Sequence, residues 1–216
     1  MTGRERLVAA ARGGELDRRP VITWGIQSQA DGVICTVTDL GSGSPDALKL
    51  VRVNLPLAKA IELGEDLTAL FSDSPESGEK RLAELTDQTK SEADKALEAG
   101  ADGICFILDG ACPAITSPME YGGHYLENDR EIIAGYEEAR FNLVYVKSEE
   151  EPYLDFVSDL PAHALGWNVQ SSGVKPGELR IHRSGAIAGN DPTADIFLVD
   201  QYEQAEPWLK QLEAVK

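Results

Sequence analysis

The sequence predicts an α/β protein: one domain, residues 1–216, built as a parallel (β/α) barrel of the TIM type. Short apolar, β-branched runs alternate with polar stretches of helical periodicity, which is the pattern of successive βαβ units. Several runs are apolar throughout, as strands covered on both faces are. The length of 216 residues is near the lower limit of about 200 for such a barrel. Whether one or more strands are missing is therefore left open.

Seven segments have the composition of strands. They are residues 20–26, 32–37, 49–55, 102–108, 141–146, 162–168 and 179–188. Residues 196–199 are a candidate eighth strand, although a short helix after Pro192 explains this run almost as well.

The longest helix is predicted over residues 75–99. Ser74 is suited to the N-cap, and Pro75 to the first helical position, where a missing N–H costs nothing. Apolar and small residues recur at spacings of three and four along it, and Gly100 is suited to the left-handed C-terminal position. A second helix is predicted from Ser117, which forms a capping-box pattern with Glu120. A final helix is predicted over residues 204–214.

The charge balance restricts the partners. Lys and Arg total 20 against 37 Asp and Glu, which gives a formal net charge of −17. Binding to nucleic acid or to an anionic membrane normally needs a basic patch, which so acidic a surface disfavours. We therefore expect a small-molecule substrate and neither a nucleic-acid nor a membrane partner. A barrel with fewer than eight strands would leave an open edge, which a homodimer could cover.

The sequence also suggests a cytoplasmic protein. No stretch reaches the roughly 20 apolar residues of a membrane span. The basic N-terminal segment lacks the apolar core of a signal peptide. The three cysteines, Cys35, Cys105 and Cys112, have no disulfide-like spacing and fit a reducing compartment.

Candidate site residues follow from one rule, that polar side chains at the carboxyl ends of parallel strands converge on a shared bowl. Seven residues at or near the predicted strand ends are assigned to substrate binding: Trp24, Gln27, Asp39, Asn54, Cys112, Asn168 and Asn190. The alternative for the segment after Asn190 is structural, with Asp191 as a helix cap and Pro192 in the first turn.

Three residues are assigned to catalysis: Asp109, Tyr121 and His124. Asp109 ends an apolar strand, so its carboxylate would lie at the rim of a low-dielectric core and could serve in proton transfer. The alternative is that it caps the following loop. Tyr121 and His124, in the aromatic segment 121–125, would assist, although His124 could equally be an ordinary surface residue. No metal-ligand set and no cofactor is predicted.

Four segments, in order, resemble the uroporphyrinogen decarboxylase superfamily, which includes cobalamin-independent and corrinoid methyltransferases. They are residues 4–21, with Asp-Arg-Arg-Pro before the first strand; 99–118, with Ala-Gly-Ala-Asp-Gly-Ile, a strand-end acid and Ser-Pro; 163–168, His-Ala-Leu-Gly-Trp-Asn; and 186–192, with Gly-Asn-Asp-Pro. The resemblance implies a (β/α)₈ barrel with its site at the carboxyl ends of the strands.

The sequence departs from this pattern at the positions that carry the family's chemistry. The decarboxylases have an arginine-rich segment after the first strand, whereas residues 24–31 contain no arginine. The methyltransferase branch binds zinc through a His-x-Cys pair and a later cysteine, and this chain has no such pair and no cysteine after Cys112. Two functions therefore stay open: a decarboxylase- or methyltransferase-related enzyme acting on a small carboxylated or methylated substrate, or a ligand-binding barrel without catalysis.

Overall fold

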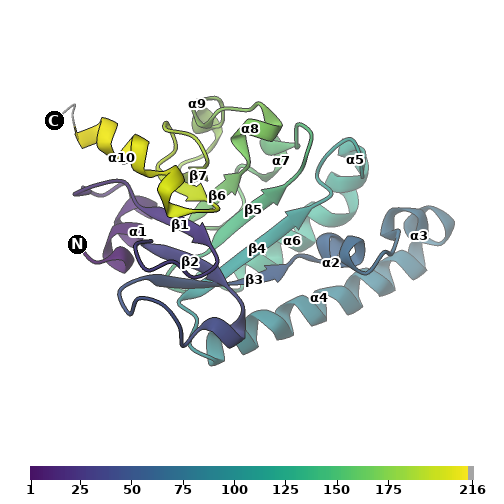
Figure 1. Cartoon of the computed structure of the whole chain (residues 1–216). Helices are drawn as coiled ribbons and strands as arrows, with labels where there is room; N and C mark the ends of the chain where they lie inside the picture. The colour runs from purple at the N-terminus through teal and green to yellow at the C-terminus, as the bar shows by residue number, and fades with distance from the viewer. Residues whose placement is uncertain (214–216) are drawn as a thin grey trace.

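The computed structural model describes residues 1–213 and has a closed barrel of eight parallel strands at its centre, in the order β1 to β8 (Figure 1). The strands are β1 (Val21–Trp24), β2 (Gly32–Cys35), β3 (Leu48–Asn54), β4 (Gly103–Asp109), β5 (Leu143–Lys147), β6 (Ala164–Trp167), β7 (Ala186–Gly189) and β8 (Ile196–Val199). β8 pairs with β1 and closes the ring. The predicted barrel is confirmed, no strand is missing, and Ile196–Val199 is a strand. The sheet therefore has no open edge for a second subunit to cover.

Alternation along the strands divides the barrel into an interior and an outer layer. Inward residues such as Ile22, Leu50 and Ile107 form one buried cluster. Their neighbours Val51 and Phe106 belong to a larger cluster with the surrounding helices. Both faces are apolar, which explains the continuous hydrophobic runs in the sequence.

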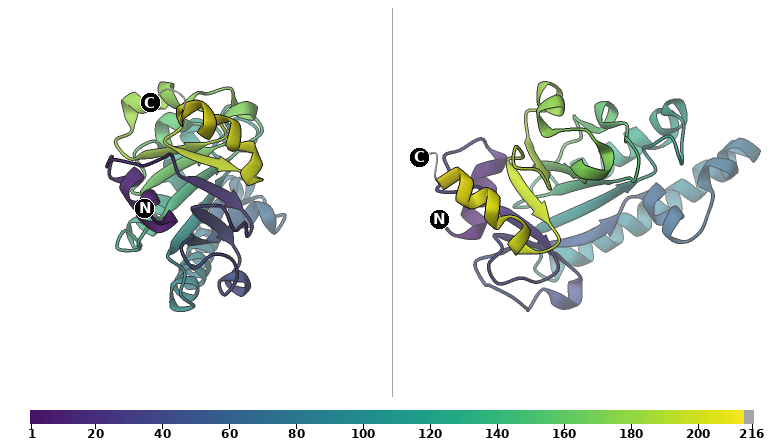
Figure 2. Two further views of the ribbon diagram at one scale, coloured as in Figure 1. Left: turned by 60° about the vertical axis from the view of Figure 1, so that its left-hand side comes forward. Right: turned by 45° about the horizontal axis from the view of Figure 1, so that its top comes forward.

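Helices cover the barrel unevenly. They are α1 (Gly3–Ala11), α2 (Pro56–Glu62), α3 (Leu67–Asp73), α4 (Pro75–Glu98), α5 (Pro118–Glu120), α6 (Leu126–Ala134), α7 (Leu154–Val157), α8 (Val169–Ser172), α9 (Pro176–Leu179) and α10 (Glu206–Glu213), with a π-helix η2 (Tyr121–Tyr125) and 3₁₀ turns η1 (Val37–Asp39), η3 (Arg180–His182) and η4 (Tyr202–Gln204). Figure 2 shows α4 running past the barrel, with α3 folded back along its projecting end. In the described residues, none of these helices has both the length and the apolar composition needed to cross a membrane.

Most predicted helices are confirmed. Ser74 caps α4 by accepting the N–H of Ser77, and Pro75 occupies its first turn. Ser117 and Glu120 form the predicted capping box. The helix then widens into the π-helix, with Tyr121 and Tyr125 both buried. α10 lies within the predicted range 204–214, of which residue 214 lies outside the described residues.

The predicted strand at residues 179–188 is wrong over residues 179–185. Helical turns α9 and η3 occupy this region, and β7 begins only at Ala186. Pro176 begins the helical turn of α9, and the turns leave Ile181 exposed while Arg183 is buried, which is not what alternation in a strand predicts. The buried guanidinium of Arg183 donates hydrogen bonds to the carbonyl oxygens of Ser158, Leu160, Ala162 and Ala186.

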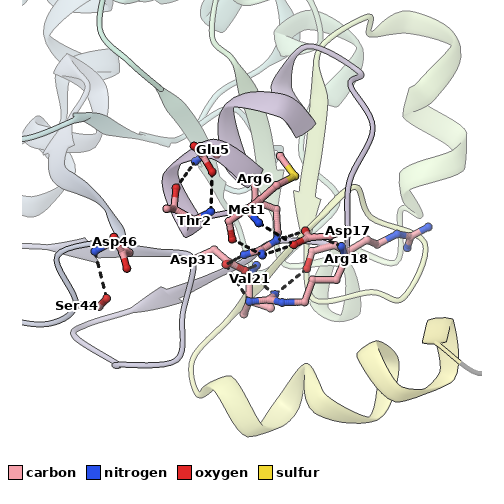
Figure 3. A network of polar contacts seen from close by, with 11 residues as sticks. Met1, Thr2, Glu5, Arg6, Asp17, Arg18, Val21, Asp31, Ser44 and Asp46 are labelled. Atoms are coloured by element: carbon pink, nitrogen blue, oxygen red, sulfur yellow. Dashed lines mark hydrogen bonds and ion pairs between the residues drawn. The ribbon is translucent and has the colours of Figure 1, made fainter.

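A network of ion pairs closes the amino-terminal end of the barrel (Figure 3). The carboxylate of Asp31 accepts hydrogen bonds from Arg6, Arg18 and the backbone N–H of Val21. Arg6 also binds Asp17, and these contacts hold the pKa of the Asp17 carboxyl well below its usual range. Leu7 of α1 packs into the interior cluster at the same end. This end of the barrel is therefore built for stability, as is usual in the fold.

Candidate functional site

The carboxyl ends of the strands carry two cavities. The first, which we call the aromatic cavity, has a volume of about 410 Å³ and is formed by residues at the ends of β1, β5, β6, β7 and β8 together with α10. The second, the ionic cavity, has a volume of about 220 Å³ and lies over β3, β4, β5 and α2. β5 contributes Tyr145 to the first and Lys147 to the second. The predicted bowl is thus divided in two.

The floor of the aromatic cavity is made by two rings from opposite sides of the barrel. Trp24 ends β1 and Tyr145 lies on β5, and their ring centroids are 4.9 Å apart with planes inclined at 79°. Both rings pack on the interior cluster. Burial, with a smaller contribution from the negative charge of Asp200, raises the pKa of Tyr145 to about 12. The hydroxyl is therefore neutral at physiological pH.

The wall of the aromatic cavity contains two fixed amides. Asn190 Nδ2 donates to Asn168 Oδ1 over 3.0 Å, and Asn190 Oδ1 accepts the N–H of Val169. Asn168 Oδ1 also accepts the N–H groups of Gln170 and Ser171, which makes it the cap of α8. The amide oxygens are thereby occupied.

The ionic cavity contains charges of both signs. Lys147 Nζ lies 2.8 Å from Asp109 Oδ2, and Asn54 Nδ2 donates to Glu62 Oε2 over 2.8 Å. The exposed Arg52 contacts Asn54 Oδ1 at 3.5 Å. Among residues 1–213 no carboxylate lies within ion-pairing distance of Arg52. Its guanidinium is thus available to an anionic ligand.

The structure places five of the ten predicted site residues at the two cavities. Trp24, Asn168 and Asn190 line the aromatic cavity, and Asn54 and Asp109 line the ionic cavity. Asp109 is not an isolated carboxyl group, because Lys147 balances its charge.

Three of the residues assigned to substrate binding lie outside both cavities. Gln27 ties the loop after β1 to the end of β8 by bonding the carbonyl oxygen of Asp200 and the N–H of Tyr202. Asp39 closes turn η1 through the hydroxyl of Thr36. Cys112 is buried. These three residues therefore shape loops around the mouth.

Tyr121 and His124 also lie outside both cavities. Tyr121 is fully buried in the layer between barrel and helices, and its hydroxyl donates to Asp129 over 3.0 Å. The exposed ring of His124 stacks on Phe71 of α3, with centroids 4.2 Å apart. After Asp109 the chain crosses to the outer layer before this helix starts, which separates both residues from the strand ends.

Sequence reasoning missed Tyr145, Asp200 and Trp208, which line the aromatic cavity. Tyr145 has the same inward parity on β5 as Lys147, so period-two alternation could have identified it. Trp208 belongs to α10, far along the chain from β1, and no local signal places it there.

Residues 1–213 contain no set of metal ligands, because no three His, Cys, Asp or Glu side chains lie close enough together to bind one ion. The zinc of the methyltransferase branch therefore does not fit these residues.

Comparison with solved structures identifies the fold. A methyltransferase from Methanosarcina mazei superposes with a TM-score of 0.72 over 88% of this chain and 82% of its own, at 14% sequence identity. This chain has the same barrel fold as that protein. At that identity the likeness shows the fold alone, and the two coverages show that such a barrel exists at a comparable length.

A second solved structure is less similar. A 2,3-dimethylmalate lyase, a member of the PEP mutase/isocitrate lyase superfamily, superposes with a TM-score of 0.47 at 9% identity, over 99% of this chain and 84% of its own. This TM-score is too low to indicate a shared fold. No protein-family model and no curated protein matches the sequence.

Proposed function

We propose that the protein is an enzyme of the uroporphyrinogen decarboxylase superfamily that acts on a small carboxylated or methylated substrate at the carboxyl ends of the strands. The observation that carries this proposal is the ionic cavity, where the Asp109–Lys147 pair lies beside Arg52, to which residues 1–213 supply no carboxylate partner. The four ordered sequence motifs and the shared methyltransferase barrel support the family assignment.

Arg52 is the group that would hold a substrate carboxylate. Its planar guanidinium can donate two parallel N–H bonds to one carboxylate. The arginines that the family places after its first strand are missing here, and Arg52 on β3 supplies a cation from a different strand. Asn54, held by Glu62, fixes the neighbouring wall.

Decarboxylation assigns distinct roles to the charged groups. The bond between the substrate carbon and its carboxylate breaks, CO₂ leaves, and the electron pair remains on carbon. The ammonium of Lys147 stabilises this charge and donates a proton to the carbon, after which water reprotonates the amine. Asp109 orients the ammonium of Lys147. Methyl transfer has less support, because no zinc ligand set is found among the described residues.

The proposal is tested on the full chain with a panel of small carboxylic acids and with uroporphyrinogen, by measuring release of ¹³C-labelled CO₂. Methyl donors form a second panel, read by mass spectrometry. We expect turnover of a small acid, strongly reduced by Arg52→Gln and by Lys147→Met. Asp87→Asn, an exposed change on α4, is the matched control.

The alternative is a binding barrel that has lost its reaction. The observation that favours it is the aromatic cavity, to whose lining the described part of the chain contributes no lysine, arginine or histidine. Ligand binding without turnover of any compound in either panel would contradict the enzyme and support this alternative.

A further inference from the structure

The aromatic cavity is lined by aromatic residues that have no role in the proposed reaction. All three tryptophans of the chain, Trp24, Trp167 and Trp208, line it together with Tyr145. Its volume of about 410 Å³ is within the range of small-ligand sites, which begins at roughly 300 Å³. Aromatic residues make up 6% of this sequence, so their concentration around one cavity calls for a ligand that binds to rings.

The charge in the cavity is negative. Asp200 follows β8, lines the cavity and is exposed, and in residues 1–213 its carboxylate has neither an ion pair nor a hydrogen bond. Among residues 1–213, no lysine, arginine or histidine lines the cavity. The net charge of −17 adds a field of the same sign. A neutral ring stacked on the tryptophans would desolvate Asp200 without compensation, whereas a cation would neutralise it.

The ring geometry also suits a cation. Trp24 and Tyr145 are in edge-to-face contact, in which the edge of one ring points at the face of the other. The ring that contributes its edge therefore has a π-face that its partner does not cover. The negative π-face of an indole or phenol attracts a cation within about 6 Å of its centroid. Two rings inclined at 79° form two walls of a corner.

The hydrogen bonds distinguish among cations. A primary ammonium has three N–H donors and needs as many acceptors. The amide oxygens of Asn168, Asn190 and Gln204 already accept backbone N–H groups, which leaves Gln170 as the lining amide whose oxygen, within residues 1–213, accepts no hydrogen bond. A methylated ammonium carries no or few N–H groups and presents methyl groups to the rings. It needs only the charge of Asp200.

We propose that the aromatic cavity binds a methylated ammonium group, through Trp24, Tyr145 and Asp200. The substrate class is then a zwitterion, with its methylated ammonium in the aromatic cavity and its carboxylate at Arg52, on the other side of β5, which lines one cavity with Tyr145 and the other with Lys147. The carboxylate end of this inference rests on the proposed function, whereas the cationic end rests on the aromatic cavity alone.

The experiment compares two acids of the same shape by isothermal titration calorimetry with the full chain. The first is N,N,N-trimethylglycine, and the second is 3,3-dimethylbutanoate, in which carbon replaces the charged nitrogen. Tetramethylammonium chloride tests the cation alone. We expect the trimethylglycine to bind at least about tenfold more tightly than its neutral-headed isostere, as cation–π and ionic contacts of this kind allow. Equal affinities would overturn the inference, as would tetramethylammonium failing to bind.

Variants locate the site. Trp24→Leu and Asp200→Asn should each weaken tetramethylammonium binding about tenfold, whereas Tyr145→Phe, which keeps the ring, should change it less than threefold. Asp73→Asn, an exposed change on α3, is the matched control for charge. Circular dichroism and thermal unfolding confirm that each variant folds. Unchanged binding in both Trp24→Leu and Asp200→Asn would overturn the inference.

The two proposals fail separately. If no acid is turned over but tetramethylammonium binds and responds to Trp24→Leu, the cation site stands and the enzyme does not. If acids without a cationic group are turned over and tetramethylammonium does not bind, the enzyme stands and the cation site is wrong.

Discussion

Asp109 and Lys147 are opposite each other in the ladder between β4 and β5, and their side chains meet with Nζ 2.8 Å from Oδ2. The pair joins the last residue of each strand at the mouth of the barrel. Because Lys147 is well exposed, the pair contributes at most about 1 kcal/mol to the free energy of unfolding. Its location in the ionic cavity favours a role in binding or catalysis over one in stability.

The first prediction concerns this pair. Lys147→Met should lower kcat for a decarboxylated acid by about 100-fold, as loss of a general acid does, and Asp109→Asn by about tenfold. The double variant should resemble Lys147→Met, because Asp109 acts through Lys147. Steady-state kinetics together with urea unfolding checks both points. Multiplicative effects in the double variant, or a fall in stability that matches the fall in rate, would contradict the assigned roles.

The second prediction concerns Asp129, which is buried and bonded to Tyr121. Burial raises its pKa in the folded protein to about 7, whereas an unfolded aspartate titrates near about 3.9. Between these values the folded state holds a proton that the unfolded chain has lost. The free energy of unfolding should therefore fall as pH rises from about 4 to about 7 and level off above that.

Asp129→Asn tests this pH dependence, since the amide oxygen can still accept from Tyr121 and carries no charge. We expect the variant to be more stable than the parent by a few kcal/mol at pH 8, because one pKa unit corresponds to about 1.4 kcal/mol. The difference should vanish near pH 4. Urea unfolding at several pH values measures it, and Asp87→Asn is the exposed control. A difference independent of pH would show that Asp129 does not titrate in this range.

The third prediction concerns Arg183. Its guanidinium is buried and bonds four backbone carbonyl oxygens, and burial lowers its pKa to about 10. Arg183→Met would remove all four bonds, and of these oxygens that of Leu160 would still accept the N–H of Ala162, so we expect a loss of about 3 kcal/mol or more in the free energy of unfolding. His182→Ala, an exposed neighbour, should change it by less than about 0.5 kcal/mol. Comparable unfolding midpoints for the two variants would refute this role.

The fourth prediction concerns Gly103 at the start of β4. A Cβ atom there would lie 1.8 Å from the carbonyl oxygen of Phe141, and backbone cannot yield as a side chain can. Gly103→Ala should therefore cost about 3 kcal/mol. Gly177→Ala is the control, because nothing lies within 4 Å of its Cβ position and its φ is not positive. Thermal unfolding of both variants decides the point, and equal melting temperatures would be incompatible with the close approach.

The sequence predicted the strands and helices of this protein more completely than the residues of its site. The runs before Asp109 and Lys147 identified strands, because apolar, β-branched segments between helical stretches have few other structures open to them. The strand predicted before Ala186 was wrong, because helical turns expose the apolar Ile181 and bury the charged Arg183, and this pattern cannot be predicted from residue type. For the site, the strand-end rule located Trp24, Asn168 and Asn190, but it also selected Gln27 and Asp39, whose side chains bond neighbouring loops.

What the sequence alone determined is local: strand and helix composition, the caps at Ser74 and Ser117, and the acidic charge that disfavours anionic partners. Closure of the barrel and the division of its mouth into two cavities were decided only by tertiary structure. Three strands, β2 to β4, separate Trp24 from Tyr145 along the chain, and the two residues meet only because the ring of strands brings β1 opposite β5. Which side chains share a cavity depends on strand register and on the path of each loop, and neither is encoded in a short stretch of sequence.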